Sequence, residues 1–356
     1  MSNKYYITTP IYYVNDKPHI GHAYTSVATD FIARFMSLRG YDVRFQTGTD
    51  EHGLKIQKAA DAKKIEPIEL CDQNSQIFRD LTVSLNLSND DFIRTTEERH
   101  IEGASYLWKR LYERDQIYLG EYTGWYSIND ETFYNEKDLV KQNDGSFKTI
   151  TGGPVEWITE KSYFFKLSEW SGKLLDLYKN NPNFISPTSK RNEVIKFVES
   201  GLNDLSVSRT SFEWGIKTPT DDTHIMYVWL DALTCYANGV NYLNDNDNEL
   251  KEYWKNVVHI VGKDILRHHA VYWPAFLLAA DLKLPKKIFA HGWWTNEGKK
   301  ISKSLGNVID PIEIINNYGL DQFRYFLLRE VPFGNDGDFS KNALINRINS
   351  DLVNDL

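Results

Sequence analysis

The hydrophobic pattern changes twice within the first forty residues. Residues 4–14 place aromatic and β-branched side chains at successive positions, which is typical of a buried strand. The polar residues 15–18 then form a turn, and apolar side chains recur at helical spacing after it. Backbone N–H groups at the start of a helix that follows a strand favour a bound phosphate. His19 and His22 flank this start and Gly21 allows close approach, so the pattern predicts a phosphate site.

Taken alone, His19-Ile-Gly-His22 fits two surface histidines beside a turn better than a ligand site. The next segment supplies context. Residues 41–50 predict a second strand, which ends in the acidic turn 50–53 before helical spacing resumes at Lys55. Strands that alternate with helices predict a parallel sheet, whose ligands bind beyond the carboxyl ends of the strands. Both polar turns therefore face one crevice.

Residues 67–85 and 97–114 have helical spacing and are expected to cover the sheet. From 116 to 222 the pattern changes to short aromatic strands with dense turn signals, among them the hairpin turn Asn143-Asp-Gly145. This part of the chain is predicted to be a module inserted into the first fold.

The parallel-sheet pattern resumes after the insert. Residues 224–233, 257–269 and 287–292 each begin with an apolar strand. The predicted fold class is therefore α/β, with a split Rossmann-like parallel sheet, an inserted domain and a C-terminal helical segment. A polar, basic loop at 297–307 follows the last strand, and residues 311–356 predict a largely helical tail.

Composition narrows the kind of protein. With 356 residues and 41% hydrophobic content, the chain can bury the cores of two or three domains. Two cysteines are too few for a disulfide framework or a tetrahedral thiolate metal site. No apolar run has the length of a membrane span and no export signal is visible, so we expect a cytoplasmic protein without membrane contact. The net charge of −8 is uneven, because lysines crowd residues 286–303 and leave a local positive field.

Two loops thus lie at opposite ends of the split domain, His19-Ile-Gly-His22 and Lys300-Ile-Ser-Lys-Ser304. In this order, with an insert between the halves, they resemble the paired ATP signatures of class I aminoacyl-tRNA synthetases. Three further segments are similar to the methionyl-tRNA synthetases in particular: Asp50-Glu-His-Gly53, Tyr227-Val-Trp-Leu-Asp-Ala232 and Gly262-Lys-Asp-Ile-Leu-Arg-His-His269. The resemblance covers essentially the whole chain.

The resemblance implies that a methionine carboxylate attacks the α-phosphate of ATP and expels pyrophosphate, so that catalysis rests on positioning and charge stabilisation. Asp264 by itself would equally fit a helix cap. Mg²⁺ is expected to accompany ATP. By resemblance, the catalytic residues are His19, His22, Lys300 and Lys303, and the ATP-binding residues are these four with Gly21, Gly262, Asp264 and Ser302.

The methionine pocket can be assigned by resemblance in the same way. Asp50 is expected to pair with the substrate ammonium, and a flexible thioether suits aromatic and aliphatic walls. Trp229 and Ile265 would also suit an ordinary buried core. Leu233 stands where some members carry proline and Pro10 where some carry alanine, and neither changes polarity. The expected methionine-binding residues are Ile11, Tyr13, Asp50, Trp229, Ala232, Leu233, Tyr236, Ile265 and His269.

The second step implied by the resemblance transfers methionine to the 2′-hydroxyl at the 3′ end of tRNA(Met), with the insert guiding the acceptor strand. Aromatic side chains of the insert, such as Tyr122, Tyr126 and Trp157, suit core packing better than base stacking. Many methionyl enzymes carry zinc knuckles in this insert. Here no cysteine lies between Cys71 and Cys235, so we expect no zinc or other protein-bound metal. Hydrophobic contacts around Tyr122, Trp125 and Tyr134 are expected instead.

The expected domains follow from these assignments. Residues 342–356 resemble the first helix of an anticodon-binding bundle, so we expect a truncated protein, and we expect it to be a monomer. The segments are 1–115, the first half of the catalytic domain; 116–222, the insert or connective peptide; 223–292, the second half; 293–341, the lysine-loop region; and 342–356, the start of the helical bundle.

Two other functions fit parts of the sequence. A class I synthetase for leucine, isoleucine, valine or cysteine would need a different pocket, and the leucine type usually needs a much larger insert than the roughly hundred residues present. A catalytically silent relative that only binds tRNA would not need His19, His22, Lys300 and Lys303. Amino-acid-dependent exchange of pyrophosphate into ATP separates these alternatives.

Overall fold

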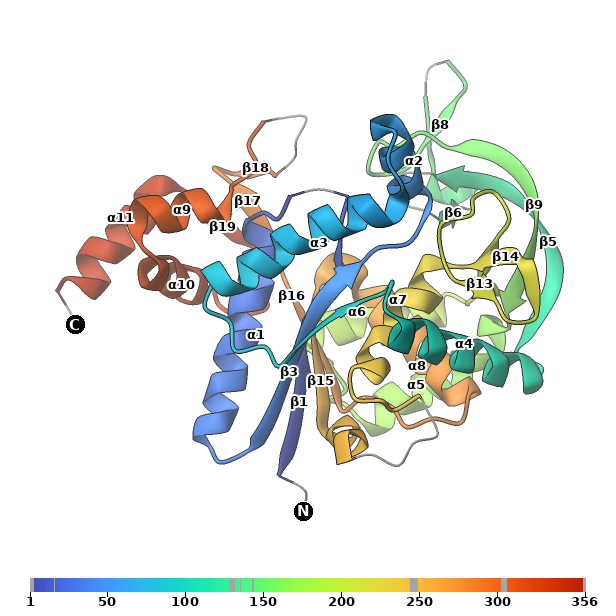
Figure 1. Cartoon of the computed structure of the whole chain (residues 1–356), viewed down its shortest axis with the longest axis horizontal. Coiled ribbons are helices and arrows are strands. Elements are labelled where there is room, and N and C mark those ends of the chain that lie inside the picture. The colour runs from blue at the N-terminus through green and yellow to red at the C-terminus, as the bar shows by residue number, and fades with distance from the viewer. Residues whose placement is uncertain are drawn as a thin grey trace.

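The computed structural model describes residues 3–15, 17–127, 132–134, 136–142, 144–243, 249–301 and 306–354. A sheet of seven parallel strands forms its centre (Figure 1). The strands are β1 (Lys4–Thr8), β2 (Tyr12–Tyr13), β3 (Asp42–Asp50), β4 (Asp91–Arg94), β10 (Ile185–Ser186), β15 (Val257–Gly262) and β16 (Lys287–His291). Hydrogen-bonded neighbours follow the order β10-β16-β15-β1-β3-β2, and β4 also pairs with β3. The split parallel sheet predicted from the sequence is confirmed.

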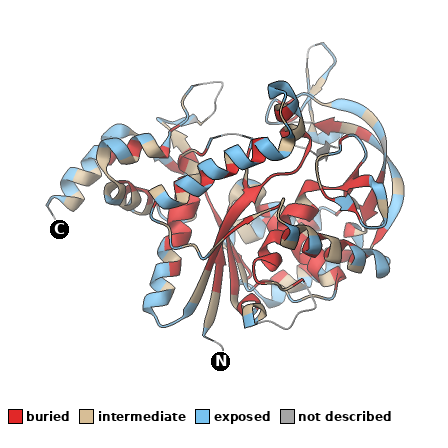
Figure 2. Ribbon diagram, in the orientation of Figure 1, coloured by how far each residue is buried: buried red, intermediate tan, exposed pale blue. Residues whose placement is uncertain are grey.

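The two halves of the sheet meet between β1 and β15, where Tyr6 lies opposite Val257. Successive residues of these strands face opposite sides, and both sides are buried. Tyr6 packs into the core formed with the helices after the insert, whereas Ile7 packs with Phe45 and with Ala33 of the first helix. The sheet therefore has helices on both faces. Figure 2 shows many buried residues at the centre of the molecule, where the sheet lies.

The two helices predicted at 67–85 and 97–114 begin and end within one residue of those positions. Pro67 starts one of them without needing an N–H donor, as proline does well at a first helical position. The helices that cover the sheet are α1 (Ile20–Leu38), α2 (Leu54–Lys63), α3 (Pro67–Ser84), α4 (Glu98–Glu113), α7 (Val228–Asn238) and α8 (Trp273–Ala279), with short 3₁₀ segments at Glu249–Asn256 and Lys263–Ile265 and a π turn at His268–Tyr272.

The insert is built on a long antiparallel pair, β5 (Ile117–Ser127) and β9 (Glu156–Phe165). The predicted turn is flanked by an antiparallel pair in which Lys141 lies opposite Phe147. Gly145 of this turn has a φ of 85°, and Asn143 lies outside the described residues. The other elements are β6 (Thr132–Tyr134), β7 (Val140–Lys141), β8 (Phe147–Lys148), β11 (Leu205–Ser206), and 3₁₀ turns at Glu136–Asp138 and Leu167–Trp170.

Part of the predicted insert packs with the main sheet. Strand β10 pairs in parallel with β16, and the flanking helices α5 (Ser171–Asn180) and α6 (Thr188–Glu199) share its core. The hydroxyl of Tyr178 donates to the carbonyl of Ala270 at 2.6 Å. The range 116–222 therefore contains an outer strand and two helices of the central fold, whereas the sequence pattern places this whole range in the insert.

Residues 224–233 are expected from the sequence to run from a strand of the parallel sheet into a helix, and the strand is found in another sheet. Strand β14 (Asp221–Met226) forms a small antiparallel sheet between β12 (Ser208–Arg209) and β13 (Lys217–Thr218). Only its last three residues are buried, whereas five of the six residues of β15 are. A central parallel strand is buried on both faces, so this half-polar strand suits an antiparallel sheet.

The C-terminal segment packs on α1. Phe323 and Phe326 share a core with Ile20 and Tyr24, and Arg324 pairs with the buried Asp30 at 2.5 Å. Figure 1 shows these helices on the opposite side of the sheet from β5 and β9. The elements are β17 (Trp294–Asn296), β18 (Lys299–Lys300), β19 (Gly337–Phe339), α9 (Pro311–Tyr318), α10 (Leu320–Arg329), α11 (Lys341–Arg347) and a π turn at Ile348–Leu352. None of the described helices has the length and apolarity needed to cross a membrane.

Candidate active site

Two histidines cap the start of α1. Nδ1 of His19 accepts a hydrogen bond from the N–H of Gly21 (3.0 Å), and Nδ1 of His22 accepts one from the N–H of His19 (3.0 Å). These bonds satisfy N–H groups that have no partner within the helix. A Cβ atom on Gly21 would lie 2.9 Å from Cε1 of His19, so a larger residue would disturb the cap.

The caps also determine where the imidazole protons lie. Burial lowers the pKa of His19, and burial together with the neighbouring His19 places the pKa of His22 well below its usual range. Both rings are therefore neutral at pH 7. Because each Nδ1 accepts a hydrogen bond, each ring carries its proton on Nε2. Each histidine can thus donate Nε2–H to an anion at the start of the helix.

Aromatic packing holds His22 in place. Its ring meets Tyr12 edge-on at 4.9 Å between centroids and Phe78 at 5.3 Å. The hydroxyl of Tyr12 contacts Ser26 at 2.7 Å, which connects strand β2 to the second turn of α1. The strand, the helix and α3 together restrict the orientation of the His22 ring.

A second group of polar residues follows β15 and β16, at the carboxyl edge of the same sheet. Trp293 donates its indole N–H to Asp264 at 3.2 Å. A Cβ atom on Gly262 would lie only 2.4 Å from Oδ1 of Asp264, so glycine leaves room for this carboxylate. Nε2 of His291 lies 2.8 Å from the hydroxyl of Thr25, which joins the end of β16 to α1.

Buried aromatic and aliphatic side chains form the other part of the site. The hydroxyl of Tyr236 donates to Nε2 of His269 (2.6 Å), and Nδ1–H of His269 donates to the carbonyl of Ile265 (2.9 Å). Burial lowers the pKa of His269 to about 4, so the ring is neutral at pH 7. The Trp229 ring stacks on the His268 ring, with 3.7 Å between the ring centroids and 12° between the ring planes. This wall thus offers apolar surface and neutral polar groups.

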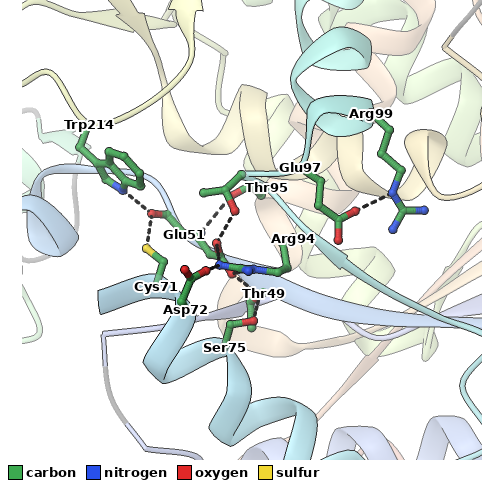
Figure 3. Close-up of polar contacts among 11 residues, drawn as sticks. Thr49, Glu51, Cys71, Asp72, Ser75, Arg94, Thr95, Glu97, Arg99 and Trp214 are labelled. Carbon is green, nitrogen blue, oxygen red and sulfur yellow. Dashed lines mark hydrogen bonds and ion pairs between the residues drawn. The ribbon is translucent and has the colours of Figure 1, made fainter. Parts of the chain in front are cut away.

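Glu51, the residue after Asp50, accepts hydrogen bonds on both of its carboxylate oxygens. Glu51 is fully buried, and its two oxygens accept from Nε and Nη2 of Arg94 at 2.8 and 3.0 Å (Figure 3). Thr49 donates to one oxygen at 2.7 Å and Thr96 to the other at 2.6 Å. The backbone of Glu51 is also bound, by Thr95, Cys71 and Trp214. The turn that carries Asp50 is therefore held firmly.

One cavity of about 920 Å³ collects these residues. It brings together all the predicted site residues whose side chains are described, namely Ile11, Tyr13, His19, Gly21, His22, Asp50, Trp229, Ala232, Leu233, Tyr236, Gly262, Asp264, Ile265 and His269. Lining residues that the sequence reasoning missed include Thr25, Lys55, Thr151, His291, Trp293 and Trp294. Residues 291–294 end or follow β16, and the rule for parallel sheets points to such positions. No sequence signal indicated Thr151, which comes from the insert.

The predicted lysine loop borders this cavity. Ser302 and Lys303 lie outside the described residues, and for Lys300 the backbone in β18 is described, where it pairs with Thr295. Ile301 and Val308 line the cavity on either side of the loop. Within the described part of the chain, no group of three or more His, Cys, Asp or Glu side chains could hold a metal ion.

A split parallel sheet with histidines at a helix start and a cavity at its carboxyl edge is the arrangement that the sequence resemblance implied, and the family match assigns it to the class I aminoacyl-tRNA synthetases. The family model described as tRNA synthetases class I (M) matches residues 5–143 and 142–356. The chain therefore belongs to the methionyl family of class I tRNA synthetases.

Curated relatives and solved structures agree with this membership. Methionine–tRNA ligase of Rickettsia conorii is 60% identical over 354 residues, covering 99% of this chain and 69% of the relative. The Brucella melitensis enzyme is 56% identical, with coverages of 99% and 68%. Mycobacterium tuberculosis methionyl-tRNA synthetase in complex with methionyl-adenylate superposes with a TM-score of 0.96 at 52% identity, covering 100% of this chain and 70% of that one. The free form of that enzyme superposes with a TM-score of 0.85 at 49% identity, covering 99% of this chain and 66% of that one.

Proposed function

We propose that this chain activates L-methionine with ATP to form methionyl-adenylate and then charges tRNA(Met), releasing AMP and pyrophosphate. The observation that carries the proposal is a cavity lined both by neutral imidazole donors and by aromatic side chains. Relatives named methionine–tRNA ligase and a matching structure with bound methionyl-adenylate support it.

In the first step, the methionine carboxylate forms a bond to the α-phosphorus as the bond to pyrophosphate breaks. Nε2–H of His19 and of His22 donate to phosphate oxygens, assisted by the N-terminus of α1. Gly262 and Asp264 bind the adenosine. These assignments rest on the positions of these groups at one edge of the sheet and on the family resemblance.

Asp50 is proposed to pair with the methionine ammonium. Ile11, Tyr13, Trp229, Ala232, Leu233, Ile265 and the Tyr236–His269 pair are proposed to enclose the side chain. A thioether suits such a wall, because it is polarizable and needs no charged partner.

Lys300, Ser302 and Lys303 are proposed to stabilise the charge that develops on the leaving pyrophosphate. The support is the sequence motif together with the position of Ile301 and Val308 at the cavity. In the second step, the 2′-hydroxyl at the tRNA 3′ end attacks the adenylate carbonyl and AMP leaves.

We propose that Mg²⁺ enters with ATP. Mg²⁺ in nucleotide sites is held mainly by phosphate oxygens and water, so the nucleotide itself would supply most of its ligands. We propose that the insert folds without zinc. The ring centroid of Trp125 lies 4.9 Å from that of Phe147 and 5.2 Å from that of Trp157, so these side chains form an apolar cluster within the insert.

We propose residues 1–115 and 223–292 as the two halves of the catalytic domain, 116–222 as the insert that meets the acceptor stem, 293–341 as the lysine-loop region and 342–356 as the start of the anticodon-binding bundle. Within the range 116–222, β10, α5 and α6 pack with the catalytic sheet, so only the remaining part would meet the acceptor stem. We also propose that the protein is a monomer and that it acts in the cytoplasm, where the substrates of the reaction are found.

Pyrophosphate exchange into ATP tests the activation step. We expect exchange with methionine and not with leucine, isoleucine, valine or cysteine. Exchange with one of these amino acids instead of methionine would point to another class I synthetase. Binding of tRNA(Met) without exchange for any amino acid would point to a catalytically silent relative.

A further inference from the structure

A buried carboxylate links the two walls of the methionine pocket. Oδ2 of Asp231 lies 2.6 Å from Nδ1 of His52, and its Oδ1 lies 2.6 Å from Nε2 of His100. The three residues come from different segments: the turn after β3, helix α7 and helix α4. Asp231 and His100 are almost inaccessible to solvent, and His52 is buried.

The donors and acceptors of this cluster can be assigned. A carboxylate only accepts, so His52 donates Nδ1–H and His100 donates Nε2–H. Nδ1 of His100 lies 3.3 Å from Nδ2 of Asn238, which can donate to it. Burial alone would raise the pKa of Asp231, but the two histidines outweigh it and lower that pKa to about 2. Asp231 is therefore a carboxylate at pH 7, with one hydrogen bond on each oxygen.

The position of the pair in the chain connects it to the substrate. His52 follows Asp50 by two residues, in the turn that also carries Glu51 and its hydrogen bonds to Arg94 and Thr96 (Figure 3). Asp231 lies in α7 between Trp229 and Ala232, both of which line the cavity. Neither His52 nor Asp231 lines the cavity itself, so any effect on substrate must pass through their neighbours.

We propose that the His52–Asp231 hydrogen bond is a positioning contact for methionine, which sets the distance between Asp50 and the α7 wall of the pocket. The inference rests on the proposed function, in which Asp50 holds the ammonium and α7 holds the side chain. A ligand that bridges two walls needs both at the correct separation, and a displacement of about 1 Å can cost about a hundredfold in rate. ATP binds elsewhere, at the start of α1 and after β15.

Two substitutions of His52 test whether a hydrogen-bond donor is needed at the place of Nδ1 or whether any polar side chain is sufficient. In His52→Asn, the side-chain amide N–H can occupy the place of Nδ1–H, whereas in His52→Gln the amide lies one methylene farther out. We expect His52→Gln to raise KM for methionine in the exchange assay by about tenfold or more, and to leave KM for ATP within about twofold. His52→Asn should return KM for methionine to within about threefold of the wild type.

His224→Leu serves as the matched control. His224 is another buried histidine, close to the carboxylate of Asp221 at 3.8 Å, but it does not line the cavity. Its substitution should lower the melting temperature without changing KM for methionine. The proposal is overturned if His52→Gln and His52→Asn behave alike, or if KM rises equally for both substrates. A wild-type protein that shows no exchange with methionine would instead refute the proposed function.

Discussion

The backbone N–H of Ile20 donates a hydrogen bond to the carbonyl oxygen of Ile309 at 3.1 Å. Ile20 is the first residue of α1, where an N–H has no partner within the helix, and Ile309 follows the lysine loop. This bond joins the histidine cap at one end of the chain to the segment that ends the loop near the other. The two proposed phosphate-binding regions thus share one backbone contact.

His19 combines two roles that substitutions can separate. His19→Ala removes both the helix cap and the Nε2–H donor, so we expect a loss of about 1 kcal/mol in stability and a fall of about a hundredfold or more in exchange rate. His19→Asn keeps a good capping side chain and should recover the stability but not the rate. Urea unfolding and the exchange assay measure the two effects. Recovery of the rate by asparagine would contradict the proposed donor role.

Gly262 leaves space for a carboxylate. In Gly262→Ala the new Cβ would lie 2.4 Å from Oδ1 of Asp264, so Asp264 must move, and we expect KM for ATP to rise about tenfold with little change in KM for methionine. Gly172→Ala is the control, because a Cβ atom added there would meet no atom within 4 Å and its backbone is helical. It should leave both constants unchanged. Equal effects on the two substrates would argue against an ATP site here.

Arg94 neutralises the buried carboxylate of Glu51. Arg94→Met leaves that charge without its cation in the interior, so we expect a loss of about 3–5 kcal/mol in the free energy of unfolding. In the control Lys255→Met, both partners of the broken ion pair with Glu252 are about half exposed, and the loss should stay below about 1 kcal/mol. Chemical denaturation at pH 7 compares the two. Similar losses would show that the Glu51 cluster is no more important than a surface pair.

Buried histidines make stability depend on pH. Burial lowers the pKa of His269 to about 4 and that of His268 to about 3, below the ordinary value near 6.5. The unfolded chain therefore binds protons that the folded chain does not, and stability falls as the pH drops below about 6.5 toward 4 and 3.

His269 alone accounts for a loss of about 3 kcal/mol at pH 4. Asp231, whose lowered pKa is about 2, adds a loss below about pH 4. Denaturant titrations from pH 8 to pH 4 measure this dependence, and His269→Gln should flatten it. A stability that stays constant from pH 7 to 4.5 would contradict the burial of neutral histidines.

A chelator should separate the metal of the reaction from any metal of the fold. We expect EDTA to abolish exchange, because Mg²⁺ accompanies ATP, and to leave the melting temperature of the protein unchanged. Added Mg²⁺ should restore exchange. A lower melting temperature in EDTA would reveal a structural metal and overturn the proposal of a zinc-free insert held by Trp125 and its aromatic neighbours.

Much of the site was predictable from local sequence. The helix cap formed by His19 and His22 depends on residues within one turn, and the glycines and carboxylates after the strands follow the general rule for parallel sheets. Every predicted site residue with a described side chain lines the same cavity. The residue types of the methionine wall came from the family resemblance, because periodicity alone cannot distinguish Trp229 from an ordinary core residue.

The sequence by itself determined the alternation of strands and helices in most of the catalytic domain, the start of α1 beside His19 and His22, and the polar turns at the strand ends. Each of these depends on neighbours along the chain. Only the tertiary structure decided that β10 joins the main sheet, that β14 pairs in an antiparallel sheet, and that His52 meets Asp231. Those outcomes depend on which distant surfaces bury each other best. Packing between two segments leaves no periodic signal in the sequence of either segment.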